Sequence, residues 1–262
     1  MKAPPQRAED AEAAVALLTA LFDQHDLILF RPIETWTEAG RKRSRVDFRN
    51  VCYRPAKAVV LRRTVELLFE SSAAGHTNLF FGVCPRAGDK GRFDFAWQIR
   101  QVRTLWADID DCSSREALAR CRQSELPQPS AVVNSGHGVH LYWSLDAPYL
   151  IDDVGDPPPV ETEWTQTPDG RKRPRRYLVE DGDRVYLDQR QHIWQVSPKA
   201  QHIQDLLAGV ANAVGGDHTT DLARLLRLPG SMNRKDQRNG RDPHLNKTGG
   251  VRTFTEISDL RV

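Results

Sequence analysis

Residues 104–111 read TLWADIDD, an apolar run that ends in three acidic residues. The run predicts a buried β-strand. Because side chains alternate between the two faces of a strand, Asp108 and Asp110 are expected to point the same way. Two carboxylates on one face repel each other unless a cation lies between them, and oxygen ligands at this spacing suit Mg²⁺ or Mn²⁺. The alternative is a solvent-facing strand end that holds no metal.

A second motif, NSGHGVHLYW at residues 134–143, predicts two strands around a glycine-containing turn. Gly136 and Gly138 allow positive φ angles and a close approach of the backbone to a ligand. Successive N–H groups in such a turn can bind phosphate oxygens. His140 shares a strand face with Tyr142, so it can address the same ligand. The alternative is an ordinary hairpin with a surface histidine.

A third motif covers residues 215–235, where Gly216-Asp217 can bring a third carboxylate to the metal. The polar and cationic residues that follow are Arg227, Asn233 and Lys235. Asp217 and Asp221 precede an apolar run, so helix capping is the alternative for both acids. A solvated helix face is the alternative for Arg224 and Arg227.

Apolar spacing and turn residues predict the remaining elements. Helices are expected over 8–24, 57–69, from Ser113, over 197–215 and over 220–228. Strands are expected over 27–30, 78–83, 104–109, 130–135 and 139–145. The stretch 148–189 is the least regular and is interpreted as an insertion or a long hairpin.

Composition predicts a globular, cytoplasmic chain. Hydrophobic residues make up 39% and charged residues 27% of the 262 residues. No apolar run approaches the ~20 residues of a membrane span, and the N-terminus lacks the apolar stretch of a signal peptide. The four cysteines form no Cys-x-x-Cys pair, so reduced structural thiols are expected and a zinc site is not.

Basic residues are clustered although the net charge is only +2. One run covers residues 41–45, RKRSR, and another covers residues 171–176, RKRPRR. Clustered lysine and arginine favour contacts with a phosphate backbone. The alternative is a pair of solvated loops.

Taken together, the three motifs resemble the archaeo-eukaryotic primase superfamily, above all the primase-polymerase domains of phages, plasmids and mobile elements. In that family an Asp-x-Asp ends one strand, a Ser-x-His-type motif follows, and a third acid comes later. The matching residues here are Asp108 with Asp110, Ser135-Gly136-His137-Gly138-Val139-His140, and Asp217. The stretch RLPGSMNRK at 227–235 is similar to the RLPG-x-x-N-x-K stretch of mobile-element members, and the resemblance runs over residues 78–236.

The resemblance implies an α/β (α+β) fold in a single primase-polymerase catalytic core. An N-terminal α/β lobe would occupy about residues 1–100. A sheet lobe of RNA-recognition-motif type would occupy about 101–236, with a basic insertion at 148–190. Residues 237–262 would form a polar tail or extension. The active site would lie in the cleft between the lobes.

The resemblance also implies the chemistry of DNA primase and DNA polymerase, a nucleotidyl transfer with two Mg²⁺ or Mn²⁺ ions. Asp108, Asp110 and Asp217 would hold the ions, with Asp221 as the alternative third ligand. One ion would lower the pKa of a 3′-hydroxyl, and the other would stabilise the α-phosphate and the departing pyrophosphate. The nucleotide-binding residues would be Ser135, Gly136, Gly138, His140, Arg227, Asn233 and Lys235. Weaker candidates for DNA contacts are Arg86, Arg171, Lys172, Arg173, Arg175 and Arg176.

The implied partners are a single-stranded DNA template with its primer and ribo- or deoxyribonucleoside triphosphates. Family members often carry a helicase domain, so a helicase is a further candidate partner. Two other functions use the same residues. One is a replication-initiator domain of the same fold that binds DNA without synthesis. The other is a metal-dependent nuclease, which does not explain the glycine-histidine turn.

Overall fold

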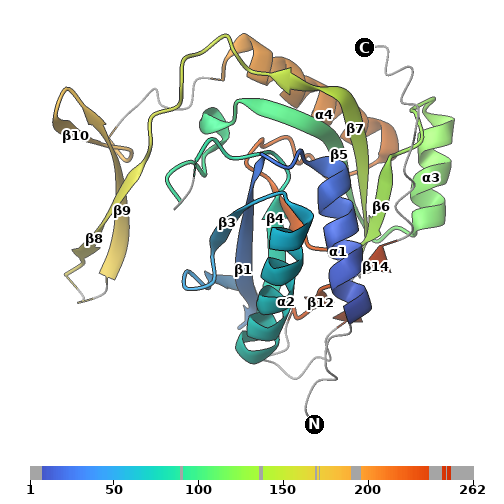
Figure 1. Ribbon diagram of the computed structural model, residues 1–262, viewed down its shortest axis with the longest axis horizontal. Helices are drawn as coiled ribbons and strands as arrows, with labels where there is room; N and C mark the ends of the chain where they lie inside the picture. Colours follow the sequence, from blue (N-terminus) through green and yellow to red (C-terminus); the bar gives the residue numbers. More distant parts are fainter. Residues whose placement is uncertain are drawn as a thin grey trace.

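Two antiparallel β-sheets form the centre of the molecule, helices cover their outer faces, and a third sheet stands apart (Figure 1). The computed structural model describes residues 8–88, 91–135, 138–168, 170, 172–189, 196–235, 244–245 and 247–248. The first and second sheets come together around the three sequence motifs.

The first sheet is built around one long strand, β1. Its members are β1 (Leu27–Glu38), β2 (Arg41–Val46), β3 (Cys52–Pro55), β4 (Asn78–Gly82) and β11 (Leu225–Arg227). The strand predicted over 27–30 is the buried start of β1, which pairs with β3 and β4. Beyond Ile33 the strand pairs with β2 as a hairpin, so it extends well past the prediction. The first basic run is therefore a strand and not a loop.

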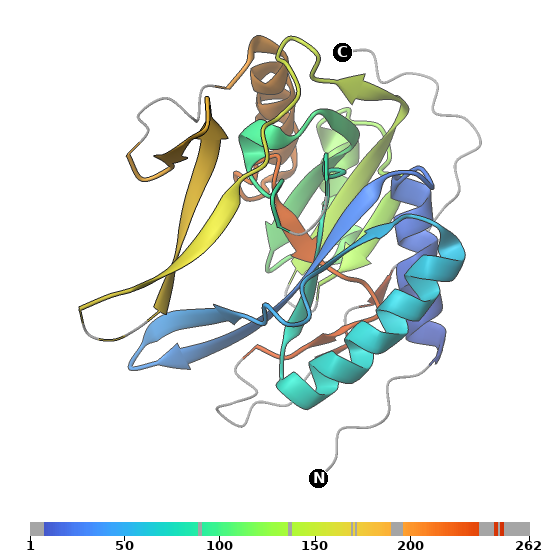
Figure 2. The same cartoon turned by 60° about the vertical axis from the view of Figure 1, so that its left-hand side comes forward.

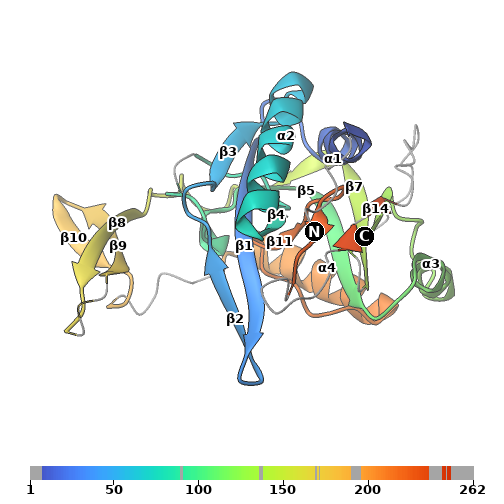
Figure 3. The ribbon, with the colours of Figure 1, turned by 90° about the horizontal axis from the view of Figure 1, so that it is seen from below.

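Two helices pack side by side on one face of the first sheet (Figure 3). They are α1 (Ala8–Leu21) and α2 (Ala58–Gly75), close to the predicted ranges. Leu17 and Leu18 of α1 and Leu61 and Val65 of α2 are fully buried. Each such side chain contributes about 1.5–3 kcal/mol on burial. None of the helices in the described residues is long and apolar enough to cross a membrane.

The second sheet carries the first two motifs. Its strand order is β14-β6-β7-β5, with β5 (Gln101–Asp110), β6 (Ala131–Asn134), β7 (Gly138–Leu150) and β14 (Lys247–Thr248). The predicted hairpin is β6–β7, which pair antiparallel. The remaining short elements are the 3₁₀ turn η1 (Ala96–Gln98) and the strand pair β12 (Met232–Asn233) and β13 (His244–Leu245).

The helices of the second sheet begin and end at the predicted caps. Helix α3 (Ser114–Gln123) has a capping box between Ser113 and Glu116. Helix α4 (Pro198–Val214) has Ser197 as N-cap and ends at Gly215, whose φ is 65°. It packs on β5.

The stretch predicted as irregular contains a third sheet of its own. Its strands are β8 (Glu161–Gln166), β9 (Lys172–Glu180) and β10 (Asp183–Tyr186), in the order β10-β9-β8. We call these three strands the arm. Figure 2 shows the arm beside the β1–β2 hairpin. The prediction of a long hairpin was correct for β8 and β9, whose register runs from Glu161↔Tyr177 to Gln166↔Lys172.

The helix predicted over 220–228 is wrong. Leucines at 222, 225, 226 and 228 imitate helical spacing, but the segment is extended and its end forms β11 against β4. The pairing of Leu225 with Gly82 and of Arg227 with Phe80 places Leu226 in the core, 1% exposed. Tertiary strand pairing thus overrides the local pattern. The segment also returns from the second sheet to the first, so the sequence beyond residue 101 is not confined to one lobe.

Candidate active site

The register between β5 and β7 aligns the first two motifs. Asp108 is opposite His140, and Asp110 is opposite Gly138. Opposite residues of an antiparallel pair share a face, so Asp108, Asp110 and His140 point to the same side. The intervening Ile109 is 1% exposed and packs in the core on the other side. The predicted strand phase of the two acids is confirmed.

The third acid reaches this face through a backbone hydrogen bond. After α4 ends at Gly215, the amide of Asp217 donates to the carbonyl of Asp108 at 2.7 Å. Gly216 permits this approach, because a Cβ at this position would lie 2.9 Å from that same carbonyl oxygen. Asp221 instead accepts a hydrogen bond from the amide of Ala223 within its own turn. Asp217, and not Asp221, therefore lies beside the pair on β5.

A pocket of about 430 Å³ lies between the two central sheets and collects residues from both. One side holds three aspartates, which we call the acid wall: Asp108, Asp110 and Asp217. The other side holds four cations, which we call the cationic wall: Lys42, Arg224, Arg227 and Lys235. Ser135 and His140 lie beside the acid wall. The pocket thus contains seven of the residues that the sequence indicated, together with others that it did not.

Two arginines of the cationic wall are held by specific contacts. Arg227 on β11 donates to Asn78 Oδ1 at 2.8 Å, and its guanidinium lies 5.3 Å from the ring centre of Phe80. Arg224 crosses the pocket and donates to Asp108 Oδ2 at 3.2 Å. Arg224 therefore forms an ion pair with the acid wall.

The pKa values of the two acids on β5, Asp108 and Asp110, are raised. Desolvation raises the pKa of Asp108, and the nearby Arg224 and Arg227 partly offset this effect. Desolvation also raises the pKa of Asp110, and the negative charges of Asp108 and Asp217 raise it further. Gathered acids that disfavour one another's ionisation are typical of a site that binds a cation.

His140 is a buried, neutral imidazole. Its side chain is 4% exposed, and its Nε2 lies 3.4 Å from Asp108 Oδ1. Burial, together with the positive charges of Arg227 and Arg224, lowers the pKa of His140 to about 3. At neutral pH it can therefore offer a phosphate oxygen a hydrogen bond, but not a positive charge.

The donor chemistry of the acid wall suits Mg²⁺ or Mn²⁺, because both ions prefer carboxylate oxygens. A divalent ion would also relieve the repulsion that raises the pKa of Asp110. Within the residues that the structure describes, no three histidine, cysteine, aspartate or glutamate side chains already surround one point. Arg224 already engages Asp108 Oδ2, so an ion would share this carboxylate with the arginine or replace it.

Several predicted site residues lie elsewhere or act differently. Gly138 is buried against β5, where a Cβ would lie 2.1 Å from the carbonyl oxygen of Ile109, so its lack of a side chain permits close strand packing. Asn233 is 2% exposed and accepts a hydrogen bond from the amide of Lys235. Gly136 and Arg171 lie outside the described residues.

Arg86 is not available to DNA, which corrects the prediction. Its side chain is fully buried, and it donates to the carbonyls of Cys84 and Ala223 at 2.9 and 3.1 Å. The predicted basic cluster Lys172, Arg173, Arg175 and Arg176 lies on β9 of the arm and contributes nothing to this pocket.

Sequence reasoning missed several residues that line the pocket: Thr35, Lys42, Phe80, Asp111 and Arg224. Lys42 belongs to the basic run at 41–45, but the run does not indicate which of its side chains faces the pocket. Asp111 was visible as a third acid after the strand. Arg224 is absent from the predicted site residues, and its alternative role on a solvated helix face depends on the helix predicted over 220–228, which is wrong.

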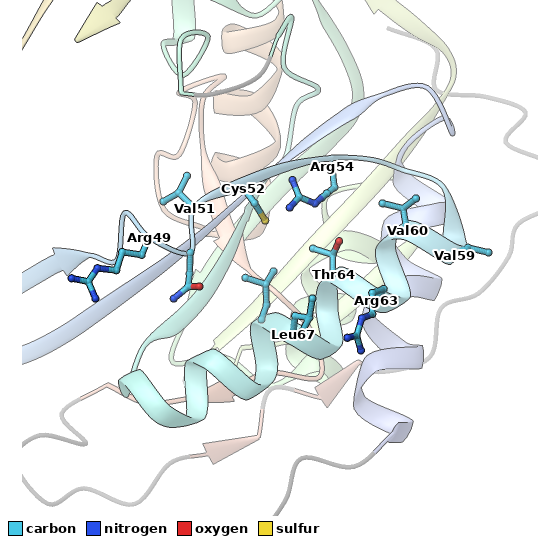
Figure 4. A pocket seen from close by; sticks show the side chains of 11 residues that line it. Arg49, Val51, Cys52, Arg54, Val59, Val60, Arg63, Thr64 and Leu67 are labelled. Atoms are coloured by element: carbon cyan, nitrogen blue, oxygen red, sulfur yellow. The ribbon is translucent and has the colours of Figure 1, made fainter. Parts of the chain in front are cut away.

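A different hollow of about 640 Å³ lies between α2 and β3 (Figure 4). Its floor is apolar, with Val51, Val60 and Leu67, and Arg49 and Arg63 stand at its edge. None of the residues that line it is acidic. It therefore lacks the ligands for metal-assisted phosphoryl transfer, although it is larger than the central pocket.

Comparison with known proteins gives a match in structure alone. No protein-family model matches the sequence, and no curated protein matches it. The AEP (archaeo-eukaryotic primase) domain of the cyanophage S-2L primase-polymerase aligns with 95% of this chain and 92% of its own, with a TM-score of 0.50 and 15% identity. The chain has the AEP fold. The fold that the sequence resemblance implied is thereby confirmed.

Two structures of the primase RepB′ also align, each over 94% of this chain, with TM-scores of 0.45. One is 13% identical and aligned over 58% of its own chain. The other is a catalytic domain in complex with initiator DNA, 12% identical and aligned over 88% of its own chain.

Proposed function

We propose that this chain is a template-directed primase-polymerase that joins nucleoside triphosphates on single-stranded DNA. One observation carries the proposal. Asp108, Asp110 and Asp217 come together from two separate segments in a pocket whose opposite wall is cationic. A triphosphate with its metal ions needs both walls, since the ions require carboxylates and the phosphates require positive charge.

Asp108, Asp110 and Asp217 would hold two Mg²⁺ or Mn²⁺ ions, which when bound would supply activation of a 3′-hydroxyl and stabilisation of charge on the triphosphate. The chain's own residues do the rest. His140 would donate a hydrogen bond to a phosphate oxygen, and Ser135, which lines the same pocket, would add another. Lys42, Arg227 and Lys235 neutralise phosphate charge from the opposite wall.

The wider setting rests on the family resemblance. A single-stranded DNA template with its primer and ribo- or deoxyribonucleotides are the proposed substrates. A helicase is the proposed partner, in the replication of a phage, plasmid or other mobile element. The AEP fold supports the primase-type activity, and the acid and cationic walls support the proposed chemistry.

The test is synthesis on single-stranded DNA. Purified protein is incubated with an unprimed or primed template, nucleotides and Mn²⁺, and products are resolved on a denaturing gel. We expect products from the wild type and a loss of several orders of magnitude in Asp108→Asn, since metal stabilisation is worth several kcal/mol. The control is Asp188→Asn, because Asp188 pairs with Arg175 on the arm, away from the pocket. Absence of product from the wild type, or full activity in Asp108→Asn, would contradict the proposal.

A second function is favoured by the contact between Arg224 and Asp108. An acid that is engaged by an arginine at 3.2 Å is also what a DNA-binding domain without catalysis would display. That function predicts salt-sensitive DNA binding that does not depend on Mn²⁺ and survives Asp108→Asn, without any synthesis. Degradation of DNA in the absence of nucleotides would instead indicate a nuclease.

A further inference from the structure

Two large aromatic side chains, Phe48 and Trp164, are exposed beside the arm. Phe48, in the turn after β2, is 63% exposed, and Trp164, on β8, is 57% exposed. Their ring centres are 6.4 Å apart with the planes at 90°. A contact that served only to attach the arm would bury these rings. Both keep more than half of their surface open to solvent, so ring faces remain for a ligand.

The two rings border a pocket of about 550 Å³ between the first sheet and the arm, which we call the arm pocket. Its volume lies within the ~300–1,000 Å³ of typical small-ligand sites. Three arginines line it, Arg31, Arg54 and Arg176, against a single acid, Asp94. Asp94 is already engaged, because it pairs with Arg31 and accepts from Tyr53 Oη at 2.5 Å. The arm pocket therefore has an excess of positive charge.

Strand alternation divides the basic residues of β9 between two faces. Arg176 is opposite Thr162, and Pro174 is opposite Trp164; all four line the arm pocket. Arg175 lies on the other face, where it pairs with Asp188 at 3.3 Å and covers the ring of Tyr186 at 3.6 Å. On that outer face Arg184 also pairs with Glu163, at 2.8 Å. Arg175 and Arg184 are thus paired with acids on the outer face, whereas Arg176 lines the arm pocket and lies 5.1 Å from the ring centre of Phe95.

We infer that the arm pocket binds single-stranded DNA, with bases stacked on Phe48 and Trp164 and phosphates beside Arg54 and Arg176. Exposed aromatic rings interleaved with arginines are how proteins bind unpaired strands with little sequence preference. Duplex DNA does not fit this chemistry, because its bases are already stacked. The choice of DNA over RNA rests on the proposed template-directed synthesis. The pocket would hold the template strand away from the site of chemistry.

The experiment measures binding of a labelled oligo(dT) of about 16 nucleotides by fluorescence anisotropy, in EDTA and without nucleotides. We expect Phe48→Ala and Trp164→Ala each to weaken binding about ten-fold, and Trp164→Phe to stay close to wild type. Val179→Ala is the matched control, because Val179 is also 57% exposed but lies on the outer face of the same sheet. It should bind as the wild type does.

The arginines give a second matched pair. Arg176→Ala should reduce the slope of log affinity against log salt by about one, whereas Arg175→Ala should leave it unchanged. A third comparison changes the oligonucleotide. An abasic oligonucleotide of equal length and charge should bind the wild type about ten-fold more weakly than oligo(dT), and Trp164→Ala should lose this preference.

Equal binding of the abasic and base-carrying strands by the wild type overturns the inference, as does wild-type affinity in Phe48→Ala and Trp164→Ala. Tighter binding of oligo(U) than of oligo(dT) would assign the arm pocket to RNA instead. Because the assay contains neither metal nor nucleotide, Asp108→Asn should bind normally. Failure of synthesis and failure of this inference are therefore seen separately.

Discussion

The acid wall and the cationic wall of the central pocket are built in different ways. The acids are short side chains fixed by backbone. The pairing of β5 with β7 fixes Asp108 and Asp110, and a hydrogen bond from the amide of Asp217 to the carbonyl of Asp108, at 2.7 Å, fixes Asp217. The cations are long side chains that come from a hairpin, a return strand and the segment after β12. Lys42 and Arg227 approach the pocket from different strands of the first sheet.

This difference separates two tasks. Metal ligands must be placed within a fraction of an ångström, which short side chains on paired backbone achieve. Charge on a triphosphate can be neutralised over several ångströms by flexible side chains, whose exact position matters less. We therefore expect the acid wall to tolerate almost no change, and the cationic wall to tolerate conservative exchange.

The largest expected effect distinguishes Asp217 from Asp221. Asp217→Asn should lower nucleotidyl transfer by at least about a hundred-fold, because a metal ligand is lost. Asp217→Glu should also lose activity, since an additional methylene displaces the carboxylate by about 1 Å. Asp221→Asn is the control and should stay within about two-fold. Steady-state kinetics measure all three, and equal loss in both positions would assign Asp221 to the acid wall.

Backbone placement of the acid wall can be tested at Gly138. Gly138→Ala should destabilise the protein by about 1–3 kcal/mol and reduce activity, because the new Cβ would meet the Ile109 carbonyl beside Asp110. Gly209→Ala is the matched control. Gly209 lies in α4 with nothing within 4 Å of the added Cβ, so this change should stabilise by about 0.5–1 kcal/mol. Urea unfolding measures both, and a neutral Gly138→Ala would show that β5 and β7 can separate without cost.

Because His140 is buried and neutral, we expect the free energy of unfolding to fall at low pH. Its pKa in the folded protein is about 3, against an ordinary value of 6.5. The unfolded chain therefore binds more protons between these values, and stability falls as the pH drops below about 6.5, by up to about 1.4 kcal/mol per unit. The raised pKa values of Asp108 and Asp110 act in the opposite sense.

The comparison is between wild type and His140→Gln, with urea unfolding followed from pH 7 to about pH 4. The variant should lose less stability over this range, while exchange of the exposed His25 for glutamine should leave the wild-type dependence unchanged. Identical pH dependence in His140→Gln would show that the buried imidazole is protonated without cost.

The smallest effect belongs to the cationic wall. Lys42→Ala should raise the KM for nucleotide by about five-fold with little change in kcat, since one exposed phosphate contact is worth about 1 kcal/mol. Lys42→Arg should restore it. Arg43→Ala is the control, because Arg43 points to the other side of β2 and pairs with Glu38 at 3.3 Å. A fall in kcat for Lys42→Ala would show that this lysine, like the acids, must occupy a fixed position for catalysis.

Local patterns in the sequence predict the structure correctly wherever residues close together in the chain determine it. The phase of Asp108 and Asp110, the β6–β7 hairpin and the caps of α4 follow from alternation, turn residues and N-cap chemistry. The resemblance of three ordered motifs to the archaeo-eukaryotic primase superfamily predicted the AEP fold. Gly215-Gly216 marked the end of α4, and this placed Asp217 close to the pair on β5.

Long-range pairing decided what the sequence could not indicate. Residues 220–228 have a helical pattern, yet β4 offers an open edge that takes Leu225–Arg227 as a strand. This change of secondary structure moved Arg224 from a presumed helix face into the pocket. Arg86 looked like an accessible cation, and only the tertiary structure reveals its burial under the carbonyl of Ala223.

The return segment has a mechanical consequence. Residues 217–228 are fastened to the second sheet by the amide of Asp217 and by Trp106, whose Nε1 donates to the carbonyl of Thr219 at 3.0 Å. They are fastened to the first sheet by the amide of Leu228, which donates to Leu79 at 2.9 Å. The segment is thus a crosslink of fixed length between the two halves of the molecule. The width of the cleft therefore depends on how many residues this crosslink contains. Because the crosslink carries Asp217, Arg224 and Arg227, inserting or deleting a residue in it would also move members of both walls.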